Sequence, residues 1–227
     1  MGGDKLKAYD ILMDILQDKN LDLDIDAMSN LKEENVKYCI LHHSGVSADQ
    51  SSSTIDVHHK GHGWLGFGYH GLVRQDGSAE KGRPLNKQGV HTSGYNHNSV
   101  AFCITGNYDI DDPKDRPEQF ETVIKIVSLV RKIFPEIQVI GHNDKQRTIC
   151  PGDNFPLDEI REKSKHTSDL FDDVPKDSIY YEYVKFAKEK GLMKGFGDGT
   201  FRGEKQMSRY HQAVVLKRLY DMLGGEK

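Results

Sequence analysis

The strongest constraint on the fold comes from two short apolar runs that each lead directly into a histidine. Residues 36–41, VKYCIL, precede His42, and residues 137–141, IQVIG, precede His142. Short, β-prone apolar runs are typical of strands buried within a sheet, and such strands present the side chains at their ends to a loop or to the sheet edge. We therefore expect two strand ends to face one site.

Further segments complete the expected core. Residues 68–74 and 99–105 are β-prone, and each is followed by a turn signal. Residues 117–134 place apolar side chains on one helical face, with a proline in the first turn and another just past the end. An amphipathic pattern also predicts a helix over residues 5–18. This mixture of strands and helices predicts an α/β domain with a mixed central β-sheet flanked by helices.

Composition and charge narrow the class of protein. Apolar residues make up 36% of the chain and charged residues 29%, which allows a packed core and argues against overall disorder. The net charge is −4 with no run of Lys or Arg, so nucleic acid is not an expected partner. No stretch approaches the ~20 apolar residues of a membrane-spanning helix. The first thirty residues lack the features of a secretion signal, so we expect a chain made in the cytoplasm.

The length of 227 residues favours two unequal domains. A polar stretch near residue 165 marks the expected boundary, so residues 1–165 form the larger domain, with residues 1–35 as an N-terminal helical extension. Residues 166–227 are expected to form a small all-α domain with helices over 178–190 and 209–223.

A histidine and a cysteine in one short polar loop give the strongest chemical signal. The loop is GHNDKQRTICPG, residues 141–152, in which His142 and Cys150 lie eight positions apart. With His42 they make a His/His/Cys set, and three protein ligands with one open position is the usual arrangement of catalytic zinc. The three cysteines are widely spaced, which favours free or metal-bound thiols over disulfides. Taken singly, a histidine is more often an ordinary hydrogen-bonded residue, and Cys150 could be an inert buried thiol.

Four segments, in the expected order along the chain, resemble one enzyme family. They are YCILHHS at 38–44, GWLGFGYHGLVRQDG at 63–77, VHTSGYNHNSVAFCITGNYD at 90–109 and VIGHNDKQRTICPG at 139–152. Together they resemble the amidase-2 family of N-acetylmuramoyl-L-alanine amidases, which includes bacteriophage lysozyme-type amidases and animal peptidoglycan recognition proteins. The resemblance covers roughly residues 36–160.

The resemblance implies roles for five residues. His42, His142 and Cys150 match the zinc ligands of the family. Tyr69 of the G-Y-H motif matches the catalytic tyrosine, which would hydrogen-bond the zinc-bound water or the developing oxyanion. Thr148 lies two positions before the cysteine, where the phage enzymes have lysine and the recognition proteins have threonine. It would be a neutral donor to the same oxyanion.

The resemblance also implies substrate contacts at His91, Thr92 and Asn98, which match family positions along the substrate groove. Ordinary polar loop residues are the alternative at these positions. The other histidines of these segments are expected at the surface; they are His58, His59, His62 and His97.

These implications describe a zinc-dependent hydrolase that cuts the amide bond between N-acetylmuramic acid and L-alanine of the peptidoglycan stem peptide. A wall-cutting domain without a secretion signal implies a phage or prophage endolysin, which acts at the bacterial cell wall after its release. The alternative is a peptidoglycan-binding protein that does not cut, as is the case for family members that lack the metal ligands.

The C-terminal residues 171–223 resemble a single S-layer homology repeat, a module that binds secondary cell-wall polymers. This sequence departs from the repeat pattern by having tyrosines where tryptophan is favoured and Arg202 where proline is common. Arg209 keeps the arginine of its motif, and a guanidinium suits an anionic polymer; a helix-start arginine in solvent is the alternative. One repeat has a small core, so we hypothesise self-association through this domain.

Overall fold

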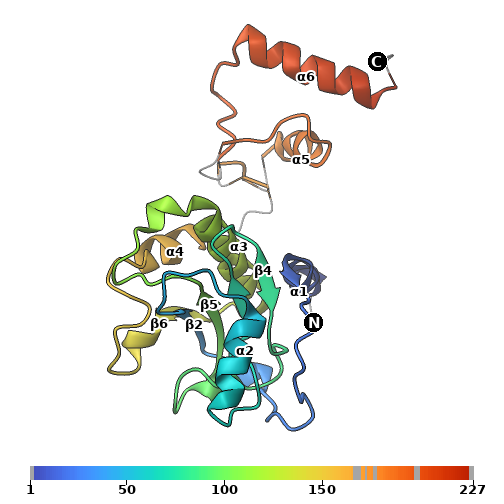
Figure 1. Ribbon diagram of the computed structural model, residues 1–227. Helices are drawn as coiled ribbons and strands as arrows, with labels where there is room; N and C mark the ends of the chain where they lie inside the picture. Colours follow the sequence, from blue (N-terminus) through green and yellow to red (C-terminus); the bar gives the residue numbers. More distant parts are fainter. Residues whose placement is uncertain (1–2, 166–169, 172, 176–177, 197–199, 225–227) are drawn as a thin grey trace. The chain divides into compact units, whose positions relative to one another are not determined.

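The computed structural model forms two compact units, Met1–Lys165 and His166–Lys227 (Figure 1). It describes residues 3–165, 170–171, 173–175, 178–196 and 200–224. None of the helices in this described part of the chain is long and apolar enough to cross a membrane.

The first unit is built on a six-stranded sheet with the strand order β1-β4-β3-β5-β2-β6. The β3–β4 pair is antiparallel and the other neighbours are parallel, so the predicted mixed sheet is confirmed. The strands are β1 Leu16–Gln17, β2 Tyr38–His43, β3 Gly71–Val73, β4 Ala79–Lys81, β5 Ser99–Ile104 and β6 Gln138–Gly141.

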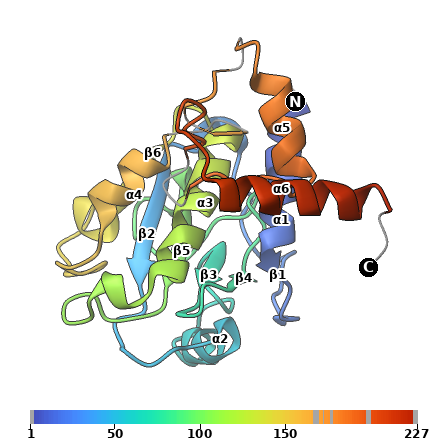
Figure 2. The ribbon, with the colours of Figure 1, turned by 90° about the horizontal axis from the view of Figure 1, so that it is seen from above.

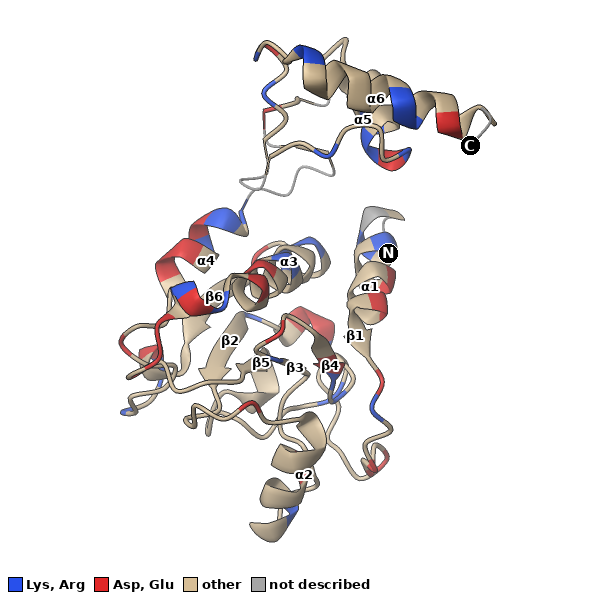
Figure 3. Ribbon diagram, turned by 45° about the horizontal axis from the view of Figure 1, so that its top comes forward, with Lys and Arg blue, Asp and Glu red and all other residues tan. Residues whose placement is uncertain are grey.

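Helices cover both faces of this sheet. The first-unit helices are α1 Gly3–Ile15, α2 Ser52–Gly61, α3 Pro117–Ile133 and α4 Leu157–Lys163. Figures 1 and 3 show α1, α3 and α4 together on one face and α2 on the other. The large core lies under the three-helix face, where α3 contributes a continuous apolar stripe. On the α2 face a smaller cluster joins Ile55 to Leu72 and Cys103.

Two differences from the expected elements have physical reasons. The helix predicted over residues 5–18 ends at Ile15, because Leu16–Gln17 pair with β4 as a short edge strand. Helix α2 was not expected, because its sequence SSTIDVHHKG carries no apolar stripe. It is specified instead by its cap, since the Ser51 side chain accepts a hydrogen bond from the Thr54 amide.

The alternation of side chains along β2 decides which of its two terminal histidines can reach a site. Cys39 and Leu41 belong to the large core under α3, whereas Ile40 belongs to a cluster on the opposite face. Successive strand residues point to opposite faces. His42 therefore shares the face of Ile40, and His43 shares the face of the large core.

The second unit contains two helices among its described residues, α5 Tyr181–Glu189 and α6 Arg209–Met222, in agreement with the predicted small all-α part (Figure 2). Its core is a small cluster of four buried side chains, Leu170, Phe171, Val174 and Val184. No residue of α6 is buried.

Candidate metal centre

The register of two parallel strands brings the two predicted histidine ligands together. β2 pairs with β6 so that Leu41 lies opposite Gly141. The next residues along the two strands, His42 and His142, are therefore neighbours at the same end of the sheet. Their ring centroids are 4.5 Å apart.

Cys150 reaches the same place because its loop folds back on itself. The first turn of the loop is the 3-10 helix η4, His142–Asp144. The amide of Asn143 donates to the Cys150 carbonyl oxygen at 2.9 Å, which closes the loop. The Cys150 sulfur then lies 3.7 Å from Nδ1 of His42.

The donor atoms of His42, His142 and Cys150 all lie within 4.8 Å of one another. Around one tetrahedral zinc ion, a thiolate sulfur and an imidazole nitrogen lie roughly 3.6 Å apart, given the usual bond lengths. The observed sulfur–nitrogen distance of 3.7 Å is close to that value. Two imidazoles and one thiol also match zinc in ligand type. The residues therefore fit a zinc ion.

A chain of hydrogen bonds fixes which nitrogen of His42 is free. The Ser99 hydroxyl donates to the Tyr95 carbonyl oxygen (2.6 Å), so its own oxygen accepts from Nε2 of His91 (3.4 Å). Nδ1 of His91 then accepts from the Thr92 hydroxyl (3.0 Å), whose oxygen accepts from Nε2 of His42 (3.4 Å). Each step has one consistent direction, so the proton of His42 is on Nε2 and the Nδ1 lone pair faces the thiol.

His142 is oriented by the same principle. The side-chain amide of Gln146 donates to the Ser93 carbonyl oxygen at 3.1 Å, so its oxygen must be the atom that lies 2.8 Å from Nε2 of His142. Nε2 therefore carries the proton, and Nδ1 is the available ligand atom. Outer partners that hold the second ring nitrogen are the usual support of metal-binding histidines.

Burial sets the protonation states of the cluster. Burial, reinforced by His142, holds the pKa of His42 well below its ordinary value, so the imidazole is neutral and able to coordinate at pH 7. Burial raises the pKa of the Cys150 thiol to about 12, so a bound cation is needed to keep it as a thiolate. Burial, together with the thiols of Cys103 and Cys150, raises the pKa of Tyr69 well above its ordinary value, so Tyr69 keeps its proton.

Tyr69 stands beside the cluster, with its ring centroid 5.1 Å from that of His42. The loop that carries it is clamped by Arg83, which is only 3% exposed and donates to the carbonyl oxygens of Phe67 (2.7 Å) and Leu65 (3.2 Å). Arg83 was missed in the sequence, because a buried arginine bonded to backbone carbonyls leaves no pattern there.

His59 corrects one expectation about the surface. It is 7% exposed, and its Nδ1 accepts a hydrogen bond from the Gly68 amide at 3.0 Å. The prediction of a surface residue was wrong because α2, which turns His59 inward, was not anticipated. His58, His62 and His97 are exposed, as predicted.

The other predicted site residues differ in whether they lie close to the cluster of His42, His142 and Cys150. The ring centroid of His91 lies 5.3 Å from that of His42, and Thr92 is 1% exposed against the same ring. Thr148 is partly buried, and its hydroxyl oxygen accepts from the Cys150 amide at 3.3 Å. Asn98 is not brought to the cluster.

Asn98 lies outside the cluster because it ends the 3-10 helix Asn96–Asn98, just before the start of β5. It precedes Ser99, which pairs with Tyr38, whereas His42 pairs with Cys103. At about 3.3 Å per strand residue, the four steps from Ser99 to Cys103 place the start of β5 roughly 13 Å from the level of His42. Its side-chain oxygen is buried and has no hydrogen-bond partner among the described residues.

Comparison with known proteins settles the family. Residues 32–153 match the family described as N-acetylmuramoyl-L-alanine amidase. The chain belongs to this amidase family. Residues 170–209 match the S-layer homology domain.

Individual relatives of this amidase-family chain agree with the assignment. It is 31% identical over 143 residues to an endolysin of Klebsiella phage KP32, a match covering 59% of the chain and 91% of the relative. It is 30% identical over 125 residues to peptidoglycan-recognition protein LB of Drosophila melanogaster, covering 51% of the chain and 54% of the relative. The solved N-acetylmuramoyl-L-alanine amidase LysCS, an endolysin from Clostridium intestinale, superimposes with a TM-score of 0.59 and 29% identity, covering 66% of this chain and 95% of that one.

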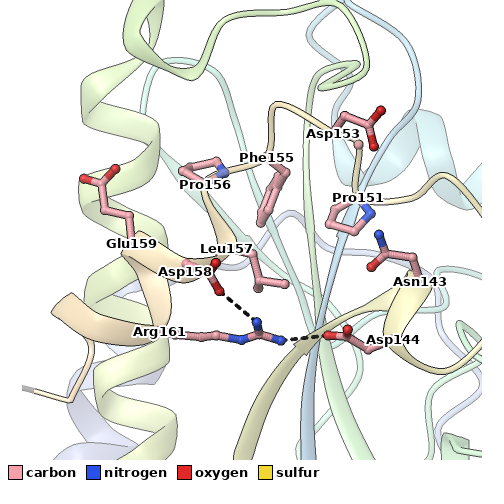
Figure 4. A pocket seen from close by; sticks show the side chains of 11 residues that line it. Asn143, Asp144, Pro151, Asp153, Phe155, Pro156, Leu157, Asp158, Glu159 and Arg161 are labelled. Atoms are coloured by element: carbon pink, nitrogen blue, oxygen red, sulfur yellow. Dashed lines mark hydrogen bonds and ion pairs between the residues drawn. The ribbon is translucent and has the colours of Figure 1, made fainter.

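A pocket of about 510 Å³ adjoins the loop of His142 and Cys150 in this amidase-family domain (Figure 4). None of the three candidate ligands lines it. Arg161 crosses it and pairs with Asp144 (2.7 Å) and Asp158 (2.9 Å). Asp144 in turn accepts from the Gly141 amide at 2.9 Å. These bonds hold the turn that carries His142, so residues that line the pocket support the candidate ligand cluster, which lies outside the pocket.

The S-layer homology unit has a basic pocket of about 340 Å³ next to α6. Among the described residues that line it there is no carboxylate, and five are basic: Lys194, Arg202, Lys205, His211 and Arg218. Arg209, the sequence candidate for polymer binding, is exposed at the first residue of α6 and does not line this pocket.

Proposed function

We propose that this chain is a zinc-dependent amidase that hydrolyses the bond between N-acetylmuramic acid and the L-alanine of the peptidoglycan stem peptide. One observation carries the proposal. In a chain of this family, three donor atoms from the end of β2, from η4 and from the following loop converge to within 4.8 Å.

His42, His142 and Cys150 would hold the ion. Zinc held there would polarise the scissile carbonyl and lower the pKa of a bound water to about 7, which would supply hydroxide at neutral pH. Thr92 and Gln146 bind the Nε2 atoms of the two imidazoles, which would leave both Nδ1 atoms available to hold the ion.

Tyr69 and Thr148 would stabilise the oxygen that becomes negative as the amide is attacked. The Tyr69 hydroxyl keeps its proton at pH 7 because burial raises its pKa, so it can donate to that oxygen. Thr148 supplies a second, neutral donor from the loop of Cys150.

Substrate contacts are assigned by exposure and position. His91 is only partly buried beside His42 and is proposed to contact substrate near the scissile bond. Thr92 is nearly inaccessible, so its proposed role moves from substrate contact to positioning His42. Asn98 lies farther along the sheet and would contact a more distant part of the substrate.

The proposal is tested by removing single ligands. His142→Ala and Cys150→Ser should abolish clearing of a peptidoglycan suspension, because each leaves an incomplete set of ligands. His97→Ala, at an exposed histidine that is not among the candidate ligands, is the matched control and should clear at the wild-type rate. Wild-type clearing by either ligand variant would refute the zinc assignment.

A second candidate function is recognition of peptidoglycan without cutting. The similarity to a recognition protein of Drosophila melanogaster supports it. The complete His/His/Cys set favours the enzyme, because a pure binder has no use for an open metal position. A binder would sediment with cell walls and release no peptide.

The phage relative supports a biological role as a phage or prophage endolysin. In this proposal the chain acts on the bacterial cell wall after its release. Residues 1–165 would be the catalytic domain, with residues 1–35 as its N-terminal helical extension, and residues 166–227 the wall-binding domain.

The proposed ligand of the C-terminal domain is an anionic cell-wall polymer. Lys194, Lys205 and Arg218 line one pocket and suit acidic groups, and Arg209 could add a further contact from the start of α6. Helix α6 also exposes Tyr210 and Leu216, which would gain from self-association. Sedimentation with purified walls tests the first idea, and light scattering at high concentration tests the second.

A further inference from the structure

Two exposed histidines at the end of α2 stand outside the machinery described above. His58 and His62 are four residues apart, at the last turn and the C-cap of the helix, so they lie on one face. Their ring centroids are 4.6 Å apart, which is nearly the separation of the His42 and His142 rings. Histidines at this spacing on a helix face can share one metal ion.

A backbone contact fixes the free nitrogen of one ring. Nδ1 of His62 lies 2.9 Å from the carbonyl oxygen of His58. A carbonyl oxygen only accepts, so Nδ1 carries the proton and the lone pair is on Nε2. A metal-binding histidine commonly has this arrangement, with its other N–H bound to a backbone carbonyl.

The local charges also favour a cation. The last turn of a helix carries partial negative charge on its carbonyl groups, and both histidines stand there. Lys60, which lies between the two histidines in the sequence, pairs with Asp56 (3.0 Å) and donates to the Asp22 carbonyl oxygen (2.8 Å). Neither histidine takes part in an ion pair recorded for residues 3–165.

The neighbouring His59 is not part of this pair. Its Nδ1 is engaged by the Gly68 amide, and its ring packs against Tyr69 and Trp64 with centroids 5.7 Å and 4.7 Å away. His59 is thus committed to the interior, while His58 and His62 face solvent.

We propose that His58 and His62 form a second metal site, which binds a divalent first-row transition ion through two imidazoles, with water completing the coordination. Two neutral nitrogen ligands select Cu²⁺ over Ni²⁺ and Zn²⁺ in the general order of affinities. Since the ion bridges two turns at the end of α2, its binding also stabilises the folded helix end.

The test is isothermal titration calorimetry. The full-length chain is first loaded with one equivalent of Zn²⁺ and is then titrated with Ni²⁺. The wild type should bind one further equivalent. His58→Ala and His62→Ala should each weaken this binding by more than the roughly tenfold cost of losing an outer-shell partner. Both side chains are exposed, so the variants should fold, which circular dichroism checks.

His97→Ala is the matched control, because His97 is also exposed but has no histidine four residues away. It should bind Ni²⁺ as the wild type does, and all four proteins should clear peptidoglycan alike. Absence of a second equivalent in the wild type, or unchanged Ni²⁺ affinity in His58→Ala and His62→Ala, overturns the proposal.

Discussion

Replacing Thr92 with valine should loosen the metal centre without touching a ligand. The hydroxyl oxygen of Thr92 is the acceptor for Nε2 of His42 at 3.4 Å, in a place that is 1% exposed. Removing it leaves a buried N–H without a partner, which costs about 1–3 kcal/mol. The bond is long, so we expect the lower part of this range and a zinc affinity weakened by about tenfold.

The assay is competition for Zn²⁺ against a chromophoric chelator. Thr122→Val is the matched control, because the Thr122 hydroxyl donates to the Gly77 carbonyl oxygen at 2.7 Å and is not part of the hydrogen-bond chain to His42. That variant should lose some stability and keep its zinc affinity. If Thr92→Val binds zinc as tightly as Thr122→Val, the hydrogen-bond chain does not orient His42.

Two other predictions concern the site and the stability of the fold. Tyr69→Phe should lower kcat by about 10²–10³ with zinc content unchanged, since only the donor to the developing oxyanion is lost, and Tyr95→Phe is the control; equal rates would remove Tyr69 from the mechanism. His70 is 1% exposed, with Nδ1 accepting from the Ala101 amide and Nε2 donating to the Lys87 carbonyl, and burial lowers its pKa to about 4. The stability that neutral His70 contributes is complete above about pH 6.5 and is lost as the pH falls toward 4. The free energy of unfolding of the wild type, measured in urea with a chelator present, should therefore fall between pH 7 and pH 5. For His70→Gln this fall should be smaller by about 2 kcal/mol. An identical loss in both would contradict the assignment.

The features predicted from sequence are those that depend on local pattern. The runs before His42 and His142 identify two buried strands, and their parallel pairing then makes the two histidines neighbours. The apolar stripe of 117–134 identifies α3, which covers the face of the sheet that points away from His42. Strand β1 has only two residues, and strand β4 has the sequence AEK, so neither forms an apolar run that the sequence could reveal.

The missed features depend on contacts between distant segments. Helix α2 is held by tertiary bonds such as that of the Asp56 carboxylate to the Phe67 amide (2.7 Å), so its own sequence looks polar. The burial of His59 follows from that helix. The positioning role proposed for Thr92 depends on a hydrogen-bond chain that joins β2 to the 91–99 segment, which no local spacing reveals.

The most direct test of zinc-dependent cleavage is mass spectrometry of purified peptidoglycan digested by the full-length chain. The untreated protein should release stem peptides whose L-alanine carries a new free amine. A chelator should stop this release, and added Zn²⁺ should restore it. Release that continues at full rate after the metal has been removed, or fragments cut at a different bond, would contradict a centre built from His42, His142 and Cys150.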